Sequence, residues 1–340
     1  MCRSSHICYN TIRNQGMEER ENMKIVFLET DTLGSGINYQ PFEQFGEVVL
    51  YAKSDIRNVE ERVKDAEIVV VNKLLMNAET LRTAQNLKLI CVTATGTNNI
   101  DFAYTNQKGI TVTNVKGYST ATVVQHTFAL YFYLMEHLPY YVNYVASGEY
   151  VKSSMFTHFG MGFHDLCGMT WGIVGLGEIG RGVAAIAKAF GCRVVYYSAS
   201  GRSQDVEYER VEFNELLVQS DVISIHAPLT EKTENLFDDK AFDKMKSSAC
   251  LINVGRGPIV NEEDLKDALN EGKIAGAALD VLSVEPMRAD NPLLQVMEKD
   301  RLVITPHIAW ASFEARKRLL EEVVLNIKAF ENGEERNVVR

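Results

Sequence analysis

The stretch GIVGLGEIGRGVAAIAKAFGCRVVYYS, residues 172–198, decides the fold of this chain. Its glycines Gly175, Gly177 and Gly180 have the spacing GxGxxG, directly after an apolar run typical of a strand. Residues 179–190 predict a helix, and 193–197 predict a second strand. In this setting the glycines permit a tight turn, approach of a pyrophosphate to bare backbone, and close contact of helix and strand. The stretch therefore predicts a βαβ unit that binds a dinucleotide at the start of its helix.

The end of the second strand of this unit bears on the choice of coenzyme. An acidic residue that binds the adenosine ribose commonly stands there, whereas this chain has Ser198. A serine does not repel a 2′-phosphate, and Arg202 could pair with one or be an ordinary solvated loop residue. The sequence therefore predicts NAD(H) or NADP(H) and leaves the preference open.

Short β-branched runs alternate with helical patterns on both sides of the dinucleotide unit, which is typical of parallel sheets covered by helices. One small α/β unit precedes it, and a second α/β series begins with it. The expected strands are 24–28, 47–51, 67–71, 89–93, 111–113, 171–174, 193–197, 221–226, 249–253, 274–280 and 302–305.

Helical patterns lie between these runs. Residues 77–84 have helical spacing and a polar start, and 262–270 follow Asn261 with Asp264 three positions on, as in a capping arrangement. A long apolar and aromatic pattern at 121–147, interrupted by Pro139, predicts a helix that packs between domains or against a second subunit. The chain ends in a helical pattern at 312–331, which could cross back onto the first unit.

Composition limits the class of protein. The chain has 340 residues, of which 46% are hydrophobic and 24% charged, enough for two domains with buried cores. Its net charge of −10 argues against nucleic acid or anionic membrane as the main partner. No run reaches the roughly 18 apolar residues of a membrane span. Six cysteines without CxxC pairs favour reduced thiols in the cytoplasm, and no histidine or cysteine spacing predicts a metal site.

Three ionisable residues follow successive predicted strands of the second series. Arg256 stands between two glycines, Glu285 precedes a proline, and His307 follows one. Each has an ordinary explanation by itself: a solvated loop arginine, a solvated acid, a histidine packed at a domain boundary. Together they meet the needs of reducing a 2-oxo acid. A cation binds the carboxylate and polarises the carbonyl, a histidine gives a proton, and a carboxylate stabilises its imidazolium.

Four blocks carry a resemblance to a known family. GLGEIG, INVGRGPIV, GAALDVLSVEP and TPHIAW, in this order, resemble the signature blocks of D-2-hydroxyacid dehydrogenases, and LKLICVTATGTNNID resembles a loop of their small domain. The resemblance implies two doubly wound parallel-sheet α/β domains with a cleft between them. A flavodoxin-like substrate domain would comprise residues 23–119 and 309–340, and a Rossmann dinucleotide domain would comprise 120–308. The polar residues 1–22 would be a disordered leader or precede the natural start at Met23.

The resemblance also assigns roles to residues. Arg256 would bind the substrate carboxylate and carbonyl, His307 would be the acid of reduction, and Glu285 would hydrogen-bond to His307. Asp280 would meet the nicotinamide carboxamide, and the backbone N–H groups of Thr95 and Gly96 would hold the substrate carboxylate. The residues implied beside the coenzyme are Gly175, Gly177, Glu178, Ile179, Gly180, Ser198, Arg202, His226, Ala227, Pro228, Asn253, Val254, Gly255, Asp280, His307 and Ala309.

Finer features resemble the glycerate dehydrogenase or hydroxypyruvate reductase branch, among them FLETDTLG, GYSTATVVQHTFAL and PHIAWAS. Lys73 would then steady a small polar substrate, or be a solvated residue after a strand; Trp310 would close over the substrate, or pack at the domain boundary. The expected reaction interconverts hydroxypyruvate or glyoxylate with D-glycerate or glycolate, in a homodimer. The alternatives are a reductase of another, pyruvate-like 2-oxo acid and a cofactor-sensing, corepressor-like binding protein of the same fold.

Overall fold

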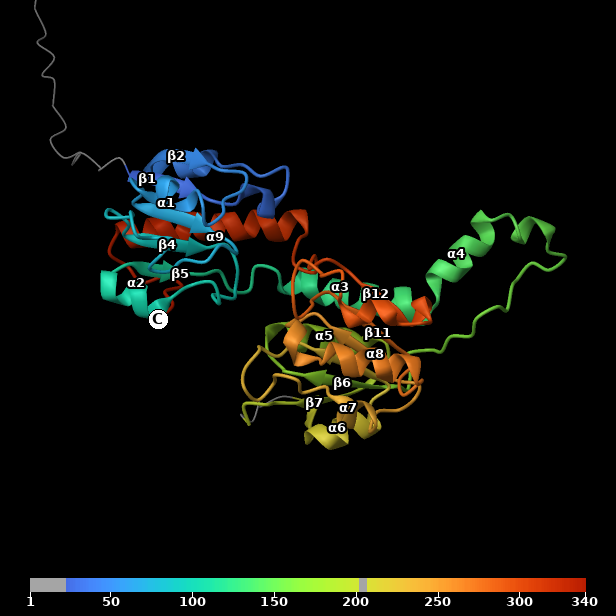
Figure 1. Cartoon of the computed structure of the whole chain (residues 1–340). Coiled ribbons are helices and arrows are strands. Elements are labelled where there is room, and N and C mark those ends of the chain that lie inside the picture. The colour runs from blue at the N-terminus through green and yellow to red at the C-terminus, as the bar shows by residue number, and fades with distance from the viewer. Residues whose placement is uncertain (1–22, 202–206) are drawn as a thin grey trace, which may run out of the picture. The chain divides into compact units, whose positions relative to one another are not determined.

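The computed structural model describes residues 23–201 and 207–340 (Figure 1). The leader 1–22 and Arg202 therefore lie outside the described residues. The chain divides into two compact units. The first combines the residues up to Lys116 with Leu319–Arg340, and the second is Gly117–Arg318. The chain thus leaves the first unit once and returns to it at its end.

The first unit is built on a five-stranded sheet in the order β2-β1-β3-β4-β5, with every neighbouring pair parallel. This is the flavodoxin-like strand order. All residues of β3 and β4 are buried, as expected for parallel strands covered on both faces. The elements of this unit are β1 (Met23–Phe27), η1 (Thr30–Leu33), η2 (Gln40–Phe45), β2 (Gly46–Leu50), α1 (Val59–Val63), β3 (Ile68–Val71), β4 (Leu89–Val92), α2 (Phe102–Lys108) and β5 (Thr111–Thr113).

The second unit is built on a seven-stranded parallel sheet in the order β12-β11-β10-β9-β6-β7-β8. The chain runs outward from β6 in one direction through β7 and β8, then returns to β9 and runs the other way. This is the Rossmann order, and its switch point lies between β6 and β9. The strands are β6 (Thr170–Val174), β7 (Arg193–Tyr197), β8 (Glu209–Arg210), β9 (Val222–Ile225), β10 (Cys250–Asn253), β11 (Gly276–Leu279) and β12 (Leu302–Ile304).

Helices and short 3-10 turns connect these strands (Figure 1). They are α3 (Thr120–Met135), α4 (Leu138–Ala146), η3 (Tyr150–Lys152), α5 (Glu178–Ala189), α6 (Phe213–Gln219), α7 (Asp239–Phe242), η4 (Gly257–Ile259), α8 (Glu262–Asn270), η5 (Pro292–Gln295) and η6 (Lys299–Arg301). The last helix, α9 (Phe313–Glu331), begins in the second unit and ends in the first. The predicted fold class, two α/β domains on parallel sheets, is confirmed.

The predicted helix at 121–147 is two helices. The first ends at Met135, and the backbone turns at His137, which has a left-handed φ of 53°. Pro139 then lies in the first turn of α4, where its missing N–H costs no helical hydrogen bond. Moreover, α3 packs within the second unit, where Phe128 and Tyr131 contact the buried Trp171. One face of α3 therefore belongs to the core of that unit, and packing against a second subunit stays a prediction.

The prediction of a helix at 77–84 is wrong, because this segment forms turns. The Asn77 side chain accepts hydrogen bonds from the backbone N–H groups of Glu79 and Thr80, at 3.0 and 3.1 Å. Such local bonds compete with helical ones. The cap of α8 is confirmed, since Asn261 accepts from the N–H groups of Glu263 and Asp264.

Candidate active site

The glycine-rich turn joins β6 to α5. Gly175 has a φ of 94°, and a Cβ there would lie 2.8 Å from the backbone of Ala227. A Cβ at Gly180 would lie 2.3 Å from the Gly175 carbonyl oxygen, so helix and strand can pack this closely only without one. At Gly177, by contrast, a Cβ would point into open space. Open space beside bare backbone at the start of a 12-residue helix fits a dinucleotide pyrophosphate.

The far end of the dinucleotide site has no acidic side chain at the expected position. Ser198 follows β7 and is 9% exposed, and its hydroxyl lies 3.1 Å from that of Ser200. Arg202 lies outside the described residues. The Arg210 guanidinium lies beside this loop and donates to the Gly201 carbonyl through Nη1 at 3.0 Å.

His226, Ala227 and Pro228 follow β9, across the switch point from the glycine turn. The His226 Nε2 lies 3.0 Å from the Ser224 hydroxyl, which also accepts a hydrogen bond from the Trp171 indole at 2.8 Å. Its Nδ1 is buried and has no hydrogen-bond partner within the described chain. Burial lowers the pKa of His226 to about 3, so the imidazole is neutral at pH 7. A buried polar atom that lacks a partner beside Ala227 is consistent with a site that a ligand completes.

Arg256 is held by the turn that follows β10. The Asn253 side chain accepts from the Gly255 N–H and donates to the Arg256 carbonyl, both at 3.0 Å. A Cβ at Gly257 would lie 2.0 Å from the Leu282 carbonyl carbon, so only glycine fits. The half-buried guanidinium donates to the Gly255 carbonyl through Nη1, at 2.7 Å. Gly257 therefore lets the turn after β10 approach the segment after β11.

Glu285 and His307 are paired. His307 Nδ1 lies 2.7 Å from Glu285 Oε2, and the other carboxylate oxygen accepts from the Leu282 N–H at 2.9 Å. The pair is partly exposed, at 28% for the His307 side chain and 34% for that of Glu285. Because Nδ1 faces the carboxylate, Nε2 is the ring nitrogen available for a substrate proton.

The three ionisable residues follow three adjacent strands of the sheet. Arg256 comes after β10, Glu285 after β11 and His307 after β12, and these strands are neighbours in the parallel sheet. The carboxyl ends of parallel strands lie along one edge, which is where open α/β sheets bind ligands. The structure therefore brings the predicted ionisable residues to the same edge as the glycine turn.

Asp280, which follows β11, is 1% exposed. Its carboxylate accepts hydrogen bonds from the N–H groups of Ile308 and Ala309, at 2.9 and 2.8 Å, and from the Thr305 hydroxyl. The contact with nicotinamide that the resemblance implies stays a prediction. The observed contacts join the ends of β11 and β12.

Tyr118 was not found by sequence reasoning. Its ring is 8% exposed and meets the ring of Trp310 edge-on, with centroids 6.2 Å apart. Burial raises the pKa of Tyr118 to about 12, although the positive charge of Arg256 acts in the opposite direction. Tyr118 thus packs against Trp310 and lies within the electrostatic influence of Arg256. No local pattern marks it, because its neighbours come from the far end of the sequence.

The predicted substrate residues Lys73, Thr95 and Gly96 belong to the first unit. Lys73 follows β3, is exposed, and donates its N–H to Glu29 at 2.9 Å. Thr95 follows β4 and donates its hydroxyl to the Val115 carbonyl at 2.8 Å. All three lie at the carboxyl edge of the first sheet, and their contacts with substrate stay predictions.

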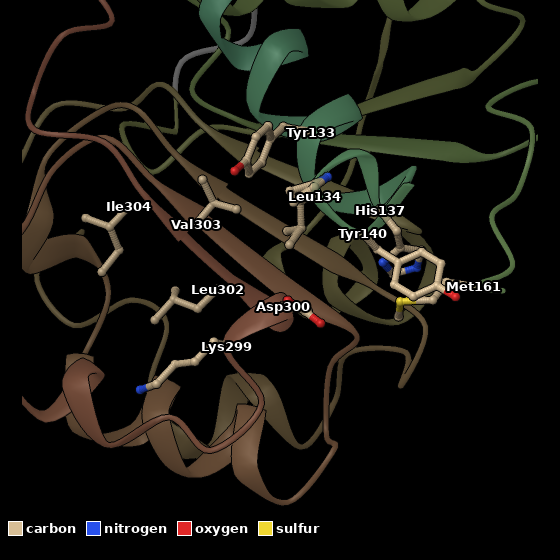
Figure 2. A pocket seen from close by; sticks show the side chains of 11 residues that line it. Tyr133, Leu134, His137, Tyr140, Met161, Lys299, Asp300, Leu302, Val303 and Ile304 are labelled. Atoms are coloured by element: carbon tan, nitrogen blue, oxygen red, sulfur yellow. The ribbon is translucent and has the colours of Figure 1, made fainter. Parts of the chain in front are cut away.

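A cavity of about 300 Å³ lies elsewhere in the second unit (Figure 2). None of the predicted site residues lines it. Its walls come from the end of α3, the start of α4, η6 and β12, together with Met161. The lining residues are Tyr133, Leu134, His137, Pro139, Tyr140, Met161, Lys299, Asp300, Leu302, Val303 and Ile304.

Metal ligands and membrane spans concern the described residues, 23–201 and 207–340. Among them, no group of three or more histidine, cysteine, aspartate or glutamate side chains is placed to hold a metal ion. Within the same part of the chain, no helix has both the length and the apolar character needed to cross a bilayer.

Comparison with known proteins identifies the class. Residues 128–309 match the model of the D-isomer specific 2-hydroxyacid dehydrogenase family, NAD binding domain. This match covers more than half of the 340 residues, and the chain belongs to this family. The predicted family and enzyme class, a dehydrogenase with a nicotinamide-dinucleotide domain, are confirmed.

Relatives resemble the chain over nearly its whole length. It is 38% identical to a hydroxypyruvate reductase of Blautia hydrogenotrophica over 324 residues, covering 93% of this chain and 99% of the relative. It is also 38% identical to a glycerate dehydrogenase of Methylorubrum extorquens over 317 residues, covering 93% and 98%. The solved structure of D-lactate dehydrogenase from Aquifex aeolicus, complexed with NAD and lactic acid, matches with a TM-score of 0.78 and 30% identity, covering 91% and 96%.

Proposed function

We propose that the protein reduces short 2-oxo acids, with hydroxypyruvate or glyoxylate as the preferred substrate and D-glycerate or glycolate as the product. The observation that carries the proposal is the 2.7 Å contact between His307 Nδ1 and Glu285 at the ligand edge of the second sheet. A dehydrogenase that reduces a carbonyl must deliver a proton as well as a hydride, and a histidine paired with a carboxylate can supply the proton. The names of the two 38% relatives support the choice of substrate.

His307 and Glu285 handle the proton. The carboxylate accepts a hydrogen bond from Nδ1 and stabilises the imidazolium, so the proton on Nε2 is ready for the carbonyl oxygen. The bound coenzyme supplies the hydride that reduces the carbonyl carbon. As the oxygen takes the Nε2 proton, the alkoxide becomes the product hydroxyl and His307 becomes neutral. In the reverse direction His307 accepts that proton as a base.

Arg256 binds the substrate. Its planar guanidinium suits two oxygens at once, one from the carboxylate and one from the carbonyl. The chain carries a net charge of −10, so the attraction of an anionic acid must come from such a local cation. Charge on the carbonyl oxygen grows during reduction, and Arg256 then stabilises the transition state more than the substrate.

Gly175, Gly177 and Gly180 would hold the coenzyme pyrophosphate against the start of α5, where the helix dipole favours negative charge. Ser198 would face the adenosine ribose. We expect it to tolerate both NADH and NADPH, because a serine at this position does not repel a 2′-phosphate as a carboxylate would.

The test is a panel of short 2-oxo acids, including hydroxypyruvate, glyoxylate and pyruvate, assayed with NADH and with NADPH. The expected result is turnover with at least hydroxypyruvate or glyoxylate, and loss of turnover in His307→Gln with coenzyme binding retained. A preference for pyruvate would overturn the substrate assignment. Coenzyme binding without turnover of any acid would overturn the assignment as a reductase of these acids and favour a cofactor-sensing protein.

We also propose a homodimer formed through the segment 138–165, called the arm, which begins with α4 and extends away from the sheet of the second unit (Figure 1). In the single chain, Val151, Phe156 and Phe159 are 88%, 91% and 85% exposed. Such a concentration of exposed apolar side chains marks an interaction surface. The arm is nevertheless ordered by its own contacts, since His158 stacks on Tyr144 at 3.8 Å.

Cytoplasmic location is part of the proposal. Burial raises the pKa of Cys91 and of Cys250 to about 12, so these thiols stay protonated and unreactive near neutral pH. Buried, unreactive thiols suit a reducing compartment. The net charge of −10 supports a small-molecule function without nucleic acid.

A further inference from the structure

The segment that carries His307 is bound to the preceding strand by one carboxylate. Asp280 Oδ1 accepts from the Thr305 hydroxyl at 2.6 Å and from the Ile308 N–H at 2.9 Å, and Oδ2 accepts from the Ala309 N–H at 2.8 Å. The Asp280 carbonyl also accepts from the His307 N–H, at 2.9 Å. Residues on both sides of His307 are therefore held by Asp280.

His307 needs such support because of its backbone. Its φ of 56° lies in the left-handed region, which is unfavourable for a residue with a side chain. Relaxation of this segment toward ordinary φ values would rotate the imidazole away from Glu285. The hydrogen bonds on either side of His307 oppose that relaxation.

A residue from a distant helix completes the network. His126, on α3, places Nε2 3.1 Å from the Thr305 hydroxyl oxygen and 3.6 Å from Asp280 Oδ1. The Thr305 hydroxyl has one proton, which it gives to Asp280 at 2.6 Å, so it accepts from His126. The donor is therefore the Nε2–H of His126. Nε2 of His126 therefore carries a proton.

The network is buried. Asp280 is 1% exposed, and donors of this chain surround its carboxylate oxygens. Without the Thr305 hydroxyl, Oδ1 loses a donor, and Asp280 must either move or admit water. In both cases the N–H groups of Ile308 and Ala309 lose their present geometry.

We propose that His126 and Thr305 are positioning residues that act through Asp280 to hold His307 in place for proton transfer. The proposal rests on the function assigned to His307 above. Neither residue is expected to touch substrate: His126 bonds to Thr305, and Thr305 bonds to Asp280. Misplacement of a catalytic group by about 1 Å lowers a rate by about 100-fold, so we expect the effect on kcat more than on KM.

The test compares variants that delete or keep each donor. Thr305→Val removes the hydroxyl and Thr305→Ser keeps it; His126→Leu removes the ring N–H and His126→Gln keeps a donor. Thr122→Val is the matched control, because Thr122 is on the same helix and its hydroxyl bonds to Ser312 at 2.9 Å instead. The measurements are kcat, KM, the Kd for ADP-ribose, and hydrogen–deuterium exchange of the Ile308 and Ala309 amides.

We expect Thr305→Val and His126→Leu to lower kcat by about 10- to 100-fold and to speed exchange of these amides at least about tenfold. The Kd for ADP-ribose should stay within about twofold, which excludes a general loss of folding. Thr305→Ser and His126→Gln should recover most of kcat. Two results would overturn the proposal. One is an exchange rate of the Ile308 and Ala309 amides in Thr305→Val equal to that of the wild type. The other is a loss of kcat in Thr122→Val as large as that in Thr305→Val. Amide exchange requires no turnover, so it decides the proposal even if the proposed substrate is wrong.

Discussion

Two loop regions of the second unit contrast sharply. In residues 280–309 a buried carboxylate, a threonine hydroxyl and backbone N–H groups are partnered within the chain. In the arm, residues 138–165, three large apolar side chains are each at least 85% exposed. The polar groups of the first region therefore find their hydrogen-bond partners within a single chain. In the second region, exposure of apolar surface to water is unfavourable, and a binding partner would relieve it.

The difference reflects what each region must do. Charged groups that act on a substrate must be fixed before it arrives, because movement during the reaction costs rate. They are accordingly held by internal hydrogen bonds. The proposed association surface has no such need, since a second copy would supply the missing contacts. The following predictions test this contrast.

The largest effect is expected in the arm. Replacement of Phe156 and Phe159 by serine should convert the proposed dimer to a monomer. Each phenylalanine buried at an interface contributes about 1.5–3 kcal/mol, and a twofold dimer contains four of them. The dimer dissociation constant should rise by about 10⁴-fold or more, measured by analytical ultracentrifugation. Phe313→Ser is the control, because Phe313 is 72% exposed outside the arm. An unchanged dimer in the double variant would refute the arm as the interface.

Arg256→Ala should lower kcat/KM by about 10²- to 10³-fold, because the substrate carboxylate loses a charged hydrogen-bonded partner. Arg256→Lys should recover part of this, since lysine keeps the charge but lacks the planar fork. Steady-state kinetics measure both. Arg193→Ala, which removes an exposed arginine paired with Glu209, serves as the control. Equal kcat/KM in Arg256→Ala and wild type would contradict the role of Arg256.

Glu285→Gln should lower kcat of reduction by about tenfold near neutral pH. The His307 ring loses its carboxylate partner at Nδ1, so the ring is held less firmly for proton transfer and its charged form is less stabilised during the reaction. Steady-state kinetics in the direction of reduction measure the loss. Wild-type kcat in Glu285→Gln would mean that Glu285 does not act on His307.

The smallest effect concerns stability. Burial lowers the pKa of His226 to about 3, below the value of about 6.5 in the unfolded chain, so the unfolded state binds more protons between these pH values. Stability should therefore fall by up to about 1.4 kcal/mol per pH unit as pH drops through this window, and be retained above it. The free energy of unfolding, measured in urea at pH 7.5 and pH 5, should depend less on pH in His226→Gln than in the wild type. An equal dependence in the two proteins would contradict the role of His226.

Local patterns predicted much of the fold because they depend on neighbouring residues. The glycine spacing, the β-branched runs and the Asn261 cap each correspond to the observed β6–α5 turn, strands and α8. Two helix predictions were wrong, because local hydrogen bonds or a backbone turn interrupted the helical pattern. Asn77 bonds to the backbone in turns, and the break between α3 and α4 comes at His137, ahead of the proline.

In the candidate site too, local patterns predicted some residues and missed others. Arg256, Glu285 and His307 were recognisable because each follows an apolar strand and carries a chemistry that the reaction needs. Tyr118, His126 and Thr305 were not, because their partners are remote in sequence and the residue types are ordinary. A threonine after a strand gives no sign of binding a buried carboxylate.

The amino-acid sequence alone determined the family, the two parallel-sheet domains, the glycine turn and the ionisable residues, since these follow from residue type and short-range spacing. The tertiary structure decided which groups meet: Glu285 with His307, and the Asp280 carboxylate with the backbone N–H groups of Ile308 and Ala309. It also decided that the large apolar side chains of the arm are exposed to solvent in the single chain. The physical reason is that hydrogen bonds and burial depend on distances of a few ångströms between residues that only the folded chain brings together.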